Sequence, residues 1–329
     1  MQIRKCMDYG TNYCPCELAQ CNQCIICDEL KDMDIKCDCN CKNSKGFCVY
    51  TEFLFNNRKA KDDRKVYSCK VYEKKEIEKN LFTLEAILPR ELFIQINMPS
   101  SFIFIKGAGL NDNFFTPISI YKKNDERNSV TLLIENKGAK TNSIYDSKET
   151  CVDIKGPYWN GLHGIDNLKK CKNETSLIIA RGVGAAPIIS IIKDLSERLN
   201  KVICLIDMEG FENNFIEEDL EKINCKAYDV KIICDGKIST AFVDFVKDVV
   251  KKEKVSLISI LSADFIIKSV IDDLSEFSEI NYCCSNNAKM CCGEGVCGSC
   301  SVRFKGNRIR KLCKEQMDPK ELFVDRRFI

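Results

Sequence analysis

Cysteine constrains this chain more than any other residue type. The sequence holds 23 Cys against a single His, His163, with ten cysteines between Cys6 and Cys48 and seven between Cys283 and Cys313. Because no apolar leader segment begins the sequence, we expect a reducing, cytoplasmic location, where so much sulfur indicates thiolate-bound metal rather than disulfides. The remaining six cysteines are scattered singly through the middle of the chain and fit small buried hydrophobic residues.

Charge and hydropathy argue against several classes of partner and reaction. The chain carries 50 Lys plus Arg and 48 Asp plus Glu, a net charge of +2, so nothing favours nucleic acid. No apolar run approaches the roughly 18 residues that a membrane helix needs. A Ser-His-Asp or Cys-His nucleophile cannot be convincingly assembled around one histidine. We therefore expect no nucleic-acid partner, no membrane partner and no hydrolase chemistry.

The hydrophobic pattern predicts a multidomain chain of four parts. Residues 1–62 form a Cys-rich metal-binding module, and residues 63–171 contain short β-rich runs separated by turns, as in an antiparallel β-barrel. Residues 172–281 alternate continuous apolar strands with amphipathic helices, which is typical of a doubly wound α/β domain. Residues 282–329 are rich in Cys and Gly. The expected barrel strands are 66–72, 81–88, 102–106, 116–121, 130–135 and 151–154, the expected parallel strands 176–180, 202–207, 230–234 and 257–261, and the expected helices 187–199, 215–223, 240–252 and 264–274.

The C-terminal cysteines predict an iron–sulfur centre. Cys292, Cys297 and Cys300 have the spacing Cys-x4-Cys-x2-Cys, and Cys313 follows as a distant fourth cysteine. This is the spacing of plant-type [2Fe–2S] clusters, in which one loop wraps the cluster and a later strand supplies the last thiolate. Glycines in the loop allow backbone N–H groups to point at the sulfur atoms. The alternative is an all-cysteine zinc site, although zinc more often takes paired Cys-x2-Cys units.

A glycine turn follows the first expected parallel strand. Gly182, Val183 and Gly184 precede Pro187, which stands at the start of an expected helix. Glycines allow a tight turn and the close approach of a ligand, and the free N–H groups of the new helix attract phosphate. The position of the turn in a doubly wound sheet predicts nucleotide binding, with a purely structural turn as the alternative.

The N-terminal cysteines predict a second metal site. A segment this short would need bound metal to be stable, and seven of its cysteines are plausible ligands. The spacing does not choose between a second iron–sulfur cluster and structural zinc, which without a nearby histidine would be held by thiolates alone. The seven are Cys14, Cys16, Cys24, Cys27, Cys37, Cys39 and Cys48.

Four further segments complete a resemblance to a known family. They are the run Thr116–Ile120, the residues Leu133–Glu135 on the next strand, the pair Lys140–Thr141 and the turn Gly156–Gly161. With the glycine turn and the C-terminal cysteines, they resemble the electron-transfer subunits of dihydroorotate dehydrogenase B and the related small subunits of sulfide dehydrogenase and NADH-dependent ferredoxin–NADP oxidoreductase. These proteins share the ferredoxin reductase-like fold, and the resemblance covers about residues 64–320.

The resemblance implies that the barrel domain binds FAD and that the α/β domain binds NAD(P)H. It places FAD contacts on one strand at Thr116, Pro117, Ile118 and Ser119, on the neighbouring strand at Leu133, Ile134 and Glu135, and near a flavin phosphate at Lys140 and Thr141. It places the NAD pyrophosphate at Gly182, Val183, Gly184 and Pro187. An ordinary β-strand would also favour the Thr, Ile and Ser residues of the first run.

Three positions depart from the pattern of this family. Thr116 stands where the family usually has Arg, so a charged bidentate phosphate clamp is missing. Trp159 replaces a glycine in the turn that joins the two domains, and Ser262-Ala263 replaces a Gly-Pro pair near the nicotinamide.

The sequence therefore predicts an oxidoreductase subunit with FAD, a [2Fe–2S] cluster and NAD(P)H as cofactors. It would pass electrons between them, in either direction, to or from a catalytic flavoprotein subunit in a hetero-oligomer. Ferredoxin is a further candidate partner, and pyrimidine biosynthesis is one process that the resemblance implies. No residue needs to act as a general acid or base, because the flavin itself converts hydride chemistry into one-electron chemistry. The alternative is a non-catalytic cluster-binding or redox-sensing subunit that has lost nucleotide chemistry.

Overall fold

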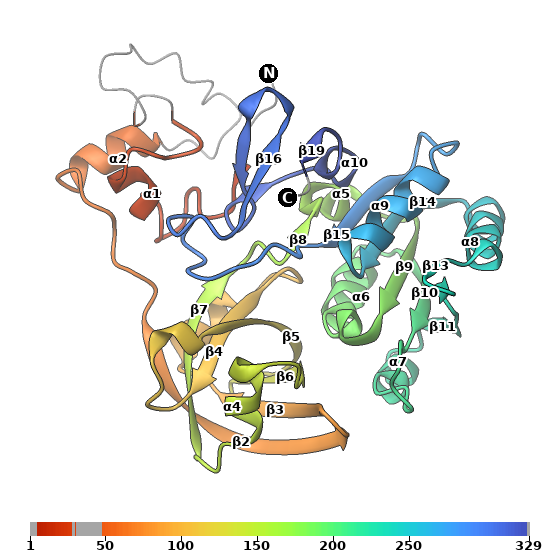
Figure 1. Ribbon diagram of the computed structural model, residues 1–329, viewed down its shortest axis with the longest axis horizontal. Helices are drawn as coiled ribbons and strands as arrows, with labels where there is room; N and C mark the ends of the chain where they lie inside the picture. Colours follow the sequence, from red (N-terminus) through yellow and green to blue (C-terminus); the bar gives the residue numbers. More distant parts are fainter. Residues whose placement is uncertain (1–4, 28–29, 31–47, 328–329) are drawn as a thin grey trace.

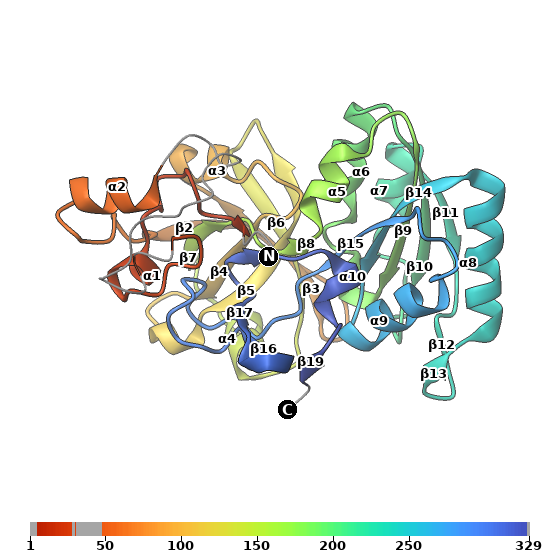
Figure 2. The same cartoon turned by 90° about the horizontal axis from the view of Figure 1, so that it is seen from above.

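The structure of the chain is a computed structural model that describes residues 5–27, 30 and 48–327 (Figure 1). A β-barrel and an α/β domain lie side by side, and the N-terminal helices lie on the side of the barrel away from the α/β domain (Figure 2). Within the described ranges, no helix is both long enough and apolar enough to cross a membrane.

Six antiparallel strands of the described chain close the barrel in the order β2-β3-β6-β5-β4-β7. Their side chains alternate between core and exterior, as in β3, where Phe82, Leu84 and Ala86 are buried in the barrel core. The predicted antiparallel barrel is confirmed. Its strands are β2 (Val66–Glu78), β3 (Leu81–Ile87), β4 (Phe102–Gly107), β5 (Thr116–Asn124), β6 (Ser129–Glu135) and β7 (Cys151–Tyr158), connected in part by α3 (Arg90–Gln95), η3 (Asp112–Phe114) and α4 (Ala139–Tyr145).

The α/β domain is built on a sheet with the order β11-β10-β9-β14-β15-β8, in which only β8 of the described strands is antiparallel. Alternate residues of β9 face opposite layers: Ile178 packs with α6, and Leu177 packs with α8 and α9. Helices therefore cover both faces, and the predicted doubly wound sheet is confirmed. Its elements are β8 (Leu162–His163), β9 (Thr175–Arg181), η4 (Gly182–Ala185), α6 (Ile188–Glu197), β10 (Lys201–Asp207), α7 (Glu217–Lys222), β11 (Lys226–Asp229), α8 (Thr240–Glu253), β14 (Val255–Leu261), α9 (Asp264–Asp273) and β15 (Asn281–Ser285).

One predicted parallel strand, 230–234, is wrong. The strand that joins the sheet at this point is β11, and the short β12 (Ile233–Cys234) forms an antiparallel hairpin with β13 (Lys237–Ile238). The turn residues Asp235 and Gly236 both have positive φ, at +51° and +74°. Asp-Gly between two strands is a strong hairpin signal, and it outweighs the apolar run before it.

The two ends of the described chain pack against each other. The strand β1 (Lys5–Cys6) pairs with β18 (Glu315–Gln316), and after β15 the chain leaves the α/β domain to lie beside the barrel (Figure 1). The other elements of these regions are α1 (Glu17–Gln20), α2 (Val49–Phe55), β16 (Ser301–Phe304), η5 (Lys305–Asn307), β17 (Ile309–Lys311), α10 (Pro319–Leu322) and β19 (Arg326–Arg327). In the middle of the chain, α5 (Ile165–Lys170) follows β8 and contacts β15. The two Cys-rich regions of the sequence therefore meet in space.

Candidate functional site

The two strands that carry most of the predicted FAD residues separate at one end of the barrel. In the described chain, β5 pairs with β6 only from Ile120 and Leu132 onward. Among the described strands, Thr116–Ser119 of β5 pair with β4 alone, and Leu133–Glu135 of β6 pair with β3 alone. One edge of each segment is thus free of ladder hydrogen bonds, and such backbone groups can bind a ligand. This arrangement fits the predicted FAD contacts.

One of the two predicted phosphate contacts, Lys140, lies next to the start of β5. The ammonium of Lys140, on α4, donates a hydrogen bond of 2.7 Å to the carbonyl oxygen of Phe115. A positive charge therefore stands beside Thr116, the position where the expected arginine is missing. Thr141 has a local role as well, because its hydroxyl oxygen accepts a hydrogen bond of 3.2 Å from the N–H of Gly138 at the start of α4.

The glycine turn packs against both the central sheet and the barrel. Gly182 has a φ of +55°, which favours glycine, and a Cβ at Gly184 would lie 2.4 Å from the carbonyl oxygen of Leu261 on β14. Ala185 shares a core with Leu133 of β6. The turn is therefore needed for close packing, and it lies against a predicted FAD strand.

Two carboxylates beside this turn were not part of the predicted site. Asp207 is buried and accepts hydrogen bonds from the N–H groups of Ile232, at 2.9 Å, and Glu209, at 2.8 Å. Arg181 forms ion pairs with Glu209, at 2.9 Å, and Asp207, at 3.3 Å. A Cβ at Gly182 would lie 2.5 Å from Oε2 of Glu209. Arg181 thus offsets negative charge at the place where the predicted pyrophosphate would bind.

The four predicted [2Fe–2S] ligands lie in two sulfur pairs. The Sγ atoms of Cys300 and Cys313 are 3.1 Å apart, and Cys297 is hydrogen-bonded to Cys292. The N–H of Glu294 donates to Sγ of Cys292 at 3.2 Å, as expected of a loop whose amides point at sulfur. Among the residues that the structure describes, no three Cys, His, Asp or Glu side chains form a ready metal site. The donor set fits a cluster, and the four-ligand arrangement stays a prediction.

Hydrogen bonding favours the thiolate form of two of these cysteines. Although burial opposes it, hydrogen bonds with Ser299 lower the pKa of Cys297. The hydrogen bond with Cys313 lowers the pKa of Cys300, again against burial. Thiolates are the metal-binding form of cysteine, so both shifts suit ligands. Burial raises the pKa of Cys292, and the hydrogen bond with Cys300 raises that of Cys313, so the thiolate form is favoured at one cysteine of each pair.

The cysteine loop packs directly on the barrel wall. A Cβ at Gly293, which has a φ of +71°, would lie 2.5 Å from Cε1 of Tyr158 on β7 and 2.9 Å from Cε2 of Phe104 on β4. Phe104 is the register partner of Pro117 on β5. Met290, just before the loop, contacts the same aromatic cluster. The loop and the predicted FAD strand are therefore separated by one strand of the barrel.

The described N-terminal cysteines only partly gather. Cys14, Cys24 and Cys27 are buried in one cluster, while Cys16 and Cys48 are partly exposed. Two further predicted ligands, Cys37 and Cys39, lie outside the described residues. The second metal site therefore stays a prediction.

A buried group of four charges next to the cysteine loop was missed by the sequence reasoning. Arg64 contacts Asp8 at 2.7 Å and Glu294 at 2.8 Å, and Lys314 contacts Glu294 at 2.8 Å and also Asp8. Burial opposes ionisation of these carboxyls, but Arg64 and Lys314 outweigh it, so the pKa of Asp8 falls to about 2 and that of Glu294 is also lowered. The sequence signal that could have pointed to this group is the position of two members: Glu294 lies inside the cysteine motif, and Lys314 directly follows Cys313.

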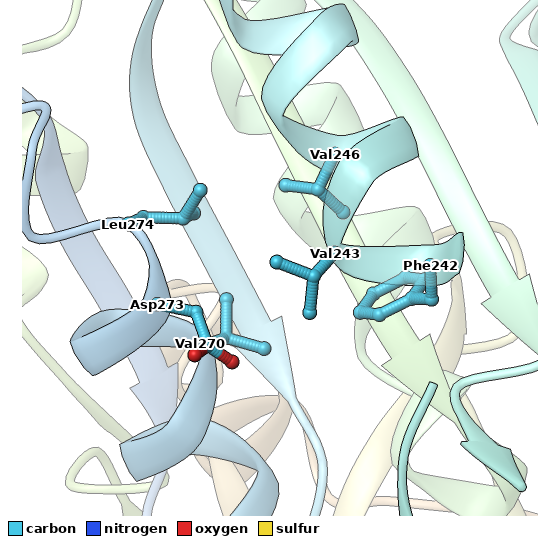
Figure 3. Close-up of a pocket in the computed structure, with 6 residues that line it drawn as sticks. All are labelled: Phe242, Val243, Val246, Val270, Asp273 and Leu274. Carbon is cyan, nitrogen blue, oxygen red and sulfur yellow. The ribbon is translucent and has the colours of Figure 1, made fainter. Parts of the chain in front are cut away.

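Figure 3 shows a crevice between α8 and α9 that is separate from these sites. It is lined by Phe242, Val243, Val246, Val270, Asp273 and Leu274. Its walls contain one charged side chain and, among the described residues, none of the predicted site residues. The crevice is a packing feature of the helical layer.

Known proteins resemble this chain in sequence over about three quarters of its length. The chain is 26% identical over 248 residues to the electron transfer subunit of dihydroorotate dehydrogenase B (NAD(+)) of Clostridium acetobutylicum, covering 75% of this chain and 92% of the relative. The corresponding subunit of Bacillus cereus strain 03BB102 is 27% identical over 252 residues, covering 74% and 93%. The resemblance is confirmed. No family model matches the chain.

Solved structures bear out the fold. A chain of an NADH-dependent reduced ferredoxin–NADP oxidoreductase aligns with a TM-score of 0.63 at 19% sequence identity, covering 78% of this chain and 89% of that chain. At this identity the alignment shows a shared fold, here the barrel joined to a doubly wound sheet.

Proposed function

We propose that the chain is the electron-transfer subunit of a flavin and iron–sulfur oxidoreductase. It passes electrons between NAD(P)H, FAD and a [2Fe–2S] cluster, to or from a catalytic flavoprotein subunit. The observation that carries this proposal is the convergence on one barrel of the glycine turn, which packs on β6, and the cysteine loop, which packs on β4 and β7. A short path between three redox groups is what such a subunit needs.

The barrel residues supply the FAD site in this proposal. Backbone groups of Thr116–Ser119 and Leu133–Glu135 hold the flavin, and Lys140 supplies a positive charge beside Thr116 for a phosphate. Bound FAD accepts a hydride and releases single electrons, which links nicotinamide to iron–sulfur chemistry. The residues of the chain orient the groups and need no proton transfer of their own.

The α/β domain supplies the nicotinamide site. The turn Gly182–Pro187 receives the pyrophosphate, with Arg181 balancing Asp207 and Glu209. Ala185 and Leu133 belong to one buried core, and the turn contacts β6 of the barrel. A nucleotide at the turn therefore lies next to the proposed flavin strand.

The cluster is held by Cys292, Cys297 and Cys300 of the loop and by Cys313. Electrons pass between this cluster and the partner. Cys297 and Val296 are exposed, so one edge of the loop is accessible to another protein. The relatives are named electron transfer subunits of dihydroorotate dehydrogenase B, which supports a hetero-oligomer with a catalytic subunit. Ferredoxin is the other candidate for this role.

Anaerobic purification followed by quantification of iron, zinc and flavin tests the proposal. We expect about two iron atoms and one FAD per chain, with additional iron if the N-terminal module holds a second cluster. Iron without flavin would overturn the proposal in favour of a cluster-binding subunit without nucleotide chemistry, which the relatives do not favour. Zinc alone would end the electron-transfer interpretation.

A further inference from the structure

The N-terminal module is docked on the cysteine loop by several independent contacts. A Cβ at Gly295 would lie 2.9 Å from Cδ1 of Leu18 on α1. The ammonium of Lys311 bridges the two regions, with hydrogen bonds of 2.6 Å to Oε1 of Gln23 and 2.7 Å to the carbonyl oxygen of Gly295. The strand pair β1–β18 adds backbone hydrogen bonds. The docked face thus includes the loop that carries three of the predicted cluster ligands.

The four buried charges lie at the centre of this docked face. Asp8 comes from the N-terminal module, Arg64 from the segment that leads into the barrel, Glu294 from the cysteine loop, and Lys314 from the position after Cys313. Each of these side chains is less than one-tenth exposed. Because two carboxylates meet two cations, the group of four is neutral, and removal of any single member leaves a buried charge without compensation.

The surroundings of the group tie it to the barrel as well. Nε of Arg64 donates to the carbonyl oxygen of Pro157 at 2.5 Å, and its guanidinium lies 4.4 Å from the ring centroid of Tyr158. The hydroxyl of Tyr158 donates to Oε1 of Glu294 at 3.0 Å. The position of the cysteine loop on the barrel therefore depends on the same carboxylate that pairs with Lys314.

We propose that the group Asp8–Arg64–Glu294–Lys314 couples the N-terminal cysteine module to the C-terminal cluster. Lys314 and Asp8 act as positioning residues that shift the reduction potential of this cluster in opposite directions. The inference rests on the proposed function for the identity of the cluster. One-electron reduction adds a negative charge to the cluster, which the cation of Lys314 favours and the carboxylate of Asp8 disfavours. Burial keeps water from screening either effect.

The test uses the full-length protein purified anaerobically with its cluster. The variants are Lys314→Met, Asp8→Asn and the double variant, which leaves the neutral pair of Arg64 and Glu294. The matched control is Lys305→Met, since Lys305 is an exposed cation of the same C-terminal segment, paired with Asp325. The readouts are the midpoint potential from a redox titration followed by electron paramagnetic resonance, and amide hydrogen exchange of residues 290–300.

We expect Lys314→Met to lower the midpoint potential, Asp8→Asn to raise it, the double variant to fall between them, and the control to match the unmodified protein. Asp8→Asn should also speed amide exchange in the loop 290–300, although Asp8 is far from it in sequence. Shifts of the same sign, or no shift in any variant, would overturn the electrostatic coupling. Unchanged loop exchange in Asp8→Asn and in the double variant would overturn the docking role.

The two readouts separate this inference from the proposed function. A protein without a [2Fe–2S] signal contradicts the proposed function, whereas the exchange measurement still decides whether Asp8 holds the loop in place. A normal signal whose potential ignores both substitutions contradicts the inference alone.

Discussion

Substitution of Gly293 by alanine tests whether the cysteine loop packs on the barrel. The added Cβ would lie 2.5 Å from Cε1 of Tyr158 and 2.9 Å from Cε2 of Phe104. Both rings are almost fully buried and meet edge to face at a centroid distance of 5.0 Å, so neither can swing away freely. We expect the loop or the rings to shift and the cluster ligands to move with them.

The magnitude follows from two separate costs. Alanine at a left-handed position costs about 1 kcal/mol relative to glycine. Forcing a methyl group into a packed site adds about 1–3 kcal/mol. Gly306 is a matched control, since its φ of +73° resembles the +71° of Gly293 but a Cβ there meets no atom of the described residues within 4 Å. We therefore expect losses of about 2–4 kcal/mol for Gly293→Ala and about 1 kcal/mol for Gly306→Ala.

The assay is urea unfolding followed by fluorescence of Trp159, the single tryptophan of the chain, which lies next to Tyr158. Iron content per chain is measured on the same samples. Equal losses of stability in the two variants, with iron retained in both, would refute the packing of the loop on β4 and β7.

The remaining predictions concern the cluster, the flavin, the nicotinamide and pH. Cys297→Ser should bleach the [2Fe–2S] absorption spectrum and leave FAD bound, and survival of both chromophores would show that the ligand assignment is wrong. Lys140→Met should lower the FAD content, because it removes the cation beside the start of β5; full flavin content would contradict that role. Gly184→Ala should abolish reduction of the flavin by NADH while FAD remains bound, since its Cβ would meet a backbone carbonyl oxygen at 2.4 Å. In the control Gly210→Ala, whose Cβ would meet no atom of the described residues within 4 Å, NADH should reduce the flavin normally. Burial lowers the pKa of His163 from 6.5 to about 4, so its neutral form stabilises the fold above pH 6.5 and up to about 3 kcal/mol is lost as the pH falls to 4. Measured by urea titration, the free energy of unfolding should fall between pH 6.5 and pH 4 by up to about 3 kcal/mol more in the wild type than in His163→Gln. An equal fall in the two proteins would disprove the role of His163.

Much of the architecture was predictable because it depends on local patterns. Runs such as 81–88 and 257–261 have strand composition and turn residues at both ends, and the structure has β3 and β14 there. The hairpin at Asp235 and Gly236 was missed because the apolar run before it resembles a buried strand. Strand β15 was missed because Cys283 and Cys284 placed this segment in the Cys- and Gly-rich C-terminal region, although both side chains are buried in the sheet.

The candidate site was predictable only where motifs are continuous in sequence. The glycine turn and the cysteine loop have characteristic spacings, so their residues could be named in advance. The charge group of Asp8, Arg64, Glu294 and Lys314 could not, because its members lie up to 306 residues apart and meet only after the ends of the chain pack together. The carboxylate of Glu209 over Gly182 depends likewise on the tertiary fold.

The most direct test of the central claim is to add NADH to the anaerobic, fully loaded protein and to follow the flavin absorption and the electron paramagnetic resonance signal of the cluster together. The account predicts that the flavin bleaches and that the signal of a reduced [2Fe–2S] cluster then develops, whereas in Cys297→Ser the flavin bleaches without that signal. A protein that contains both groups but in which neither responds to NADH or NADPH would contradict the account.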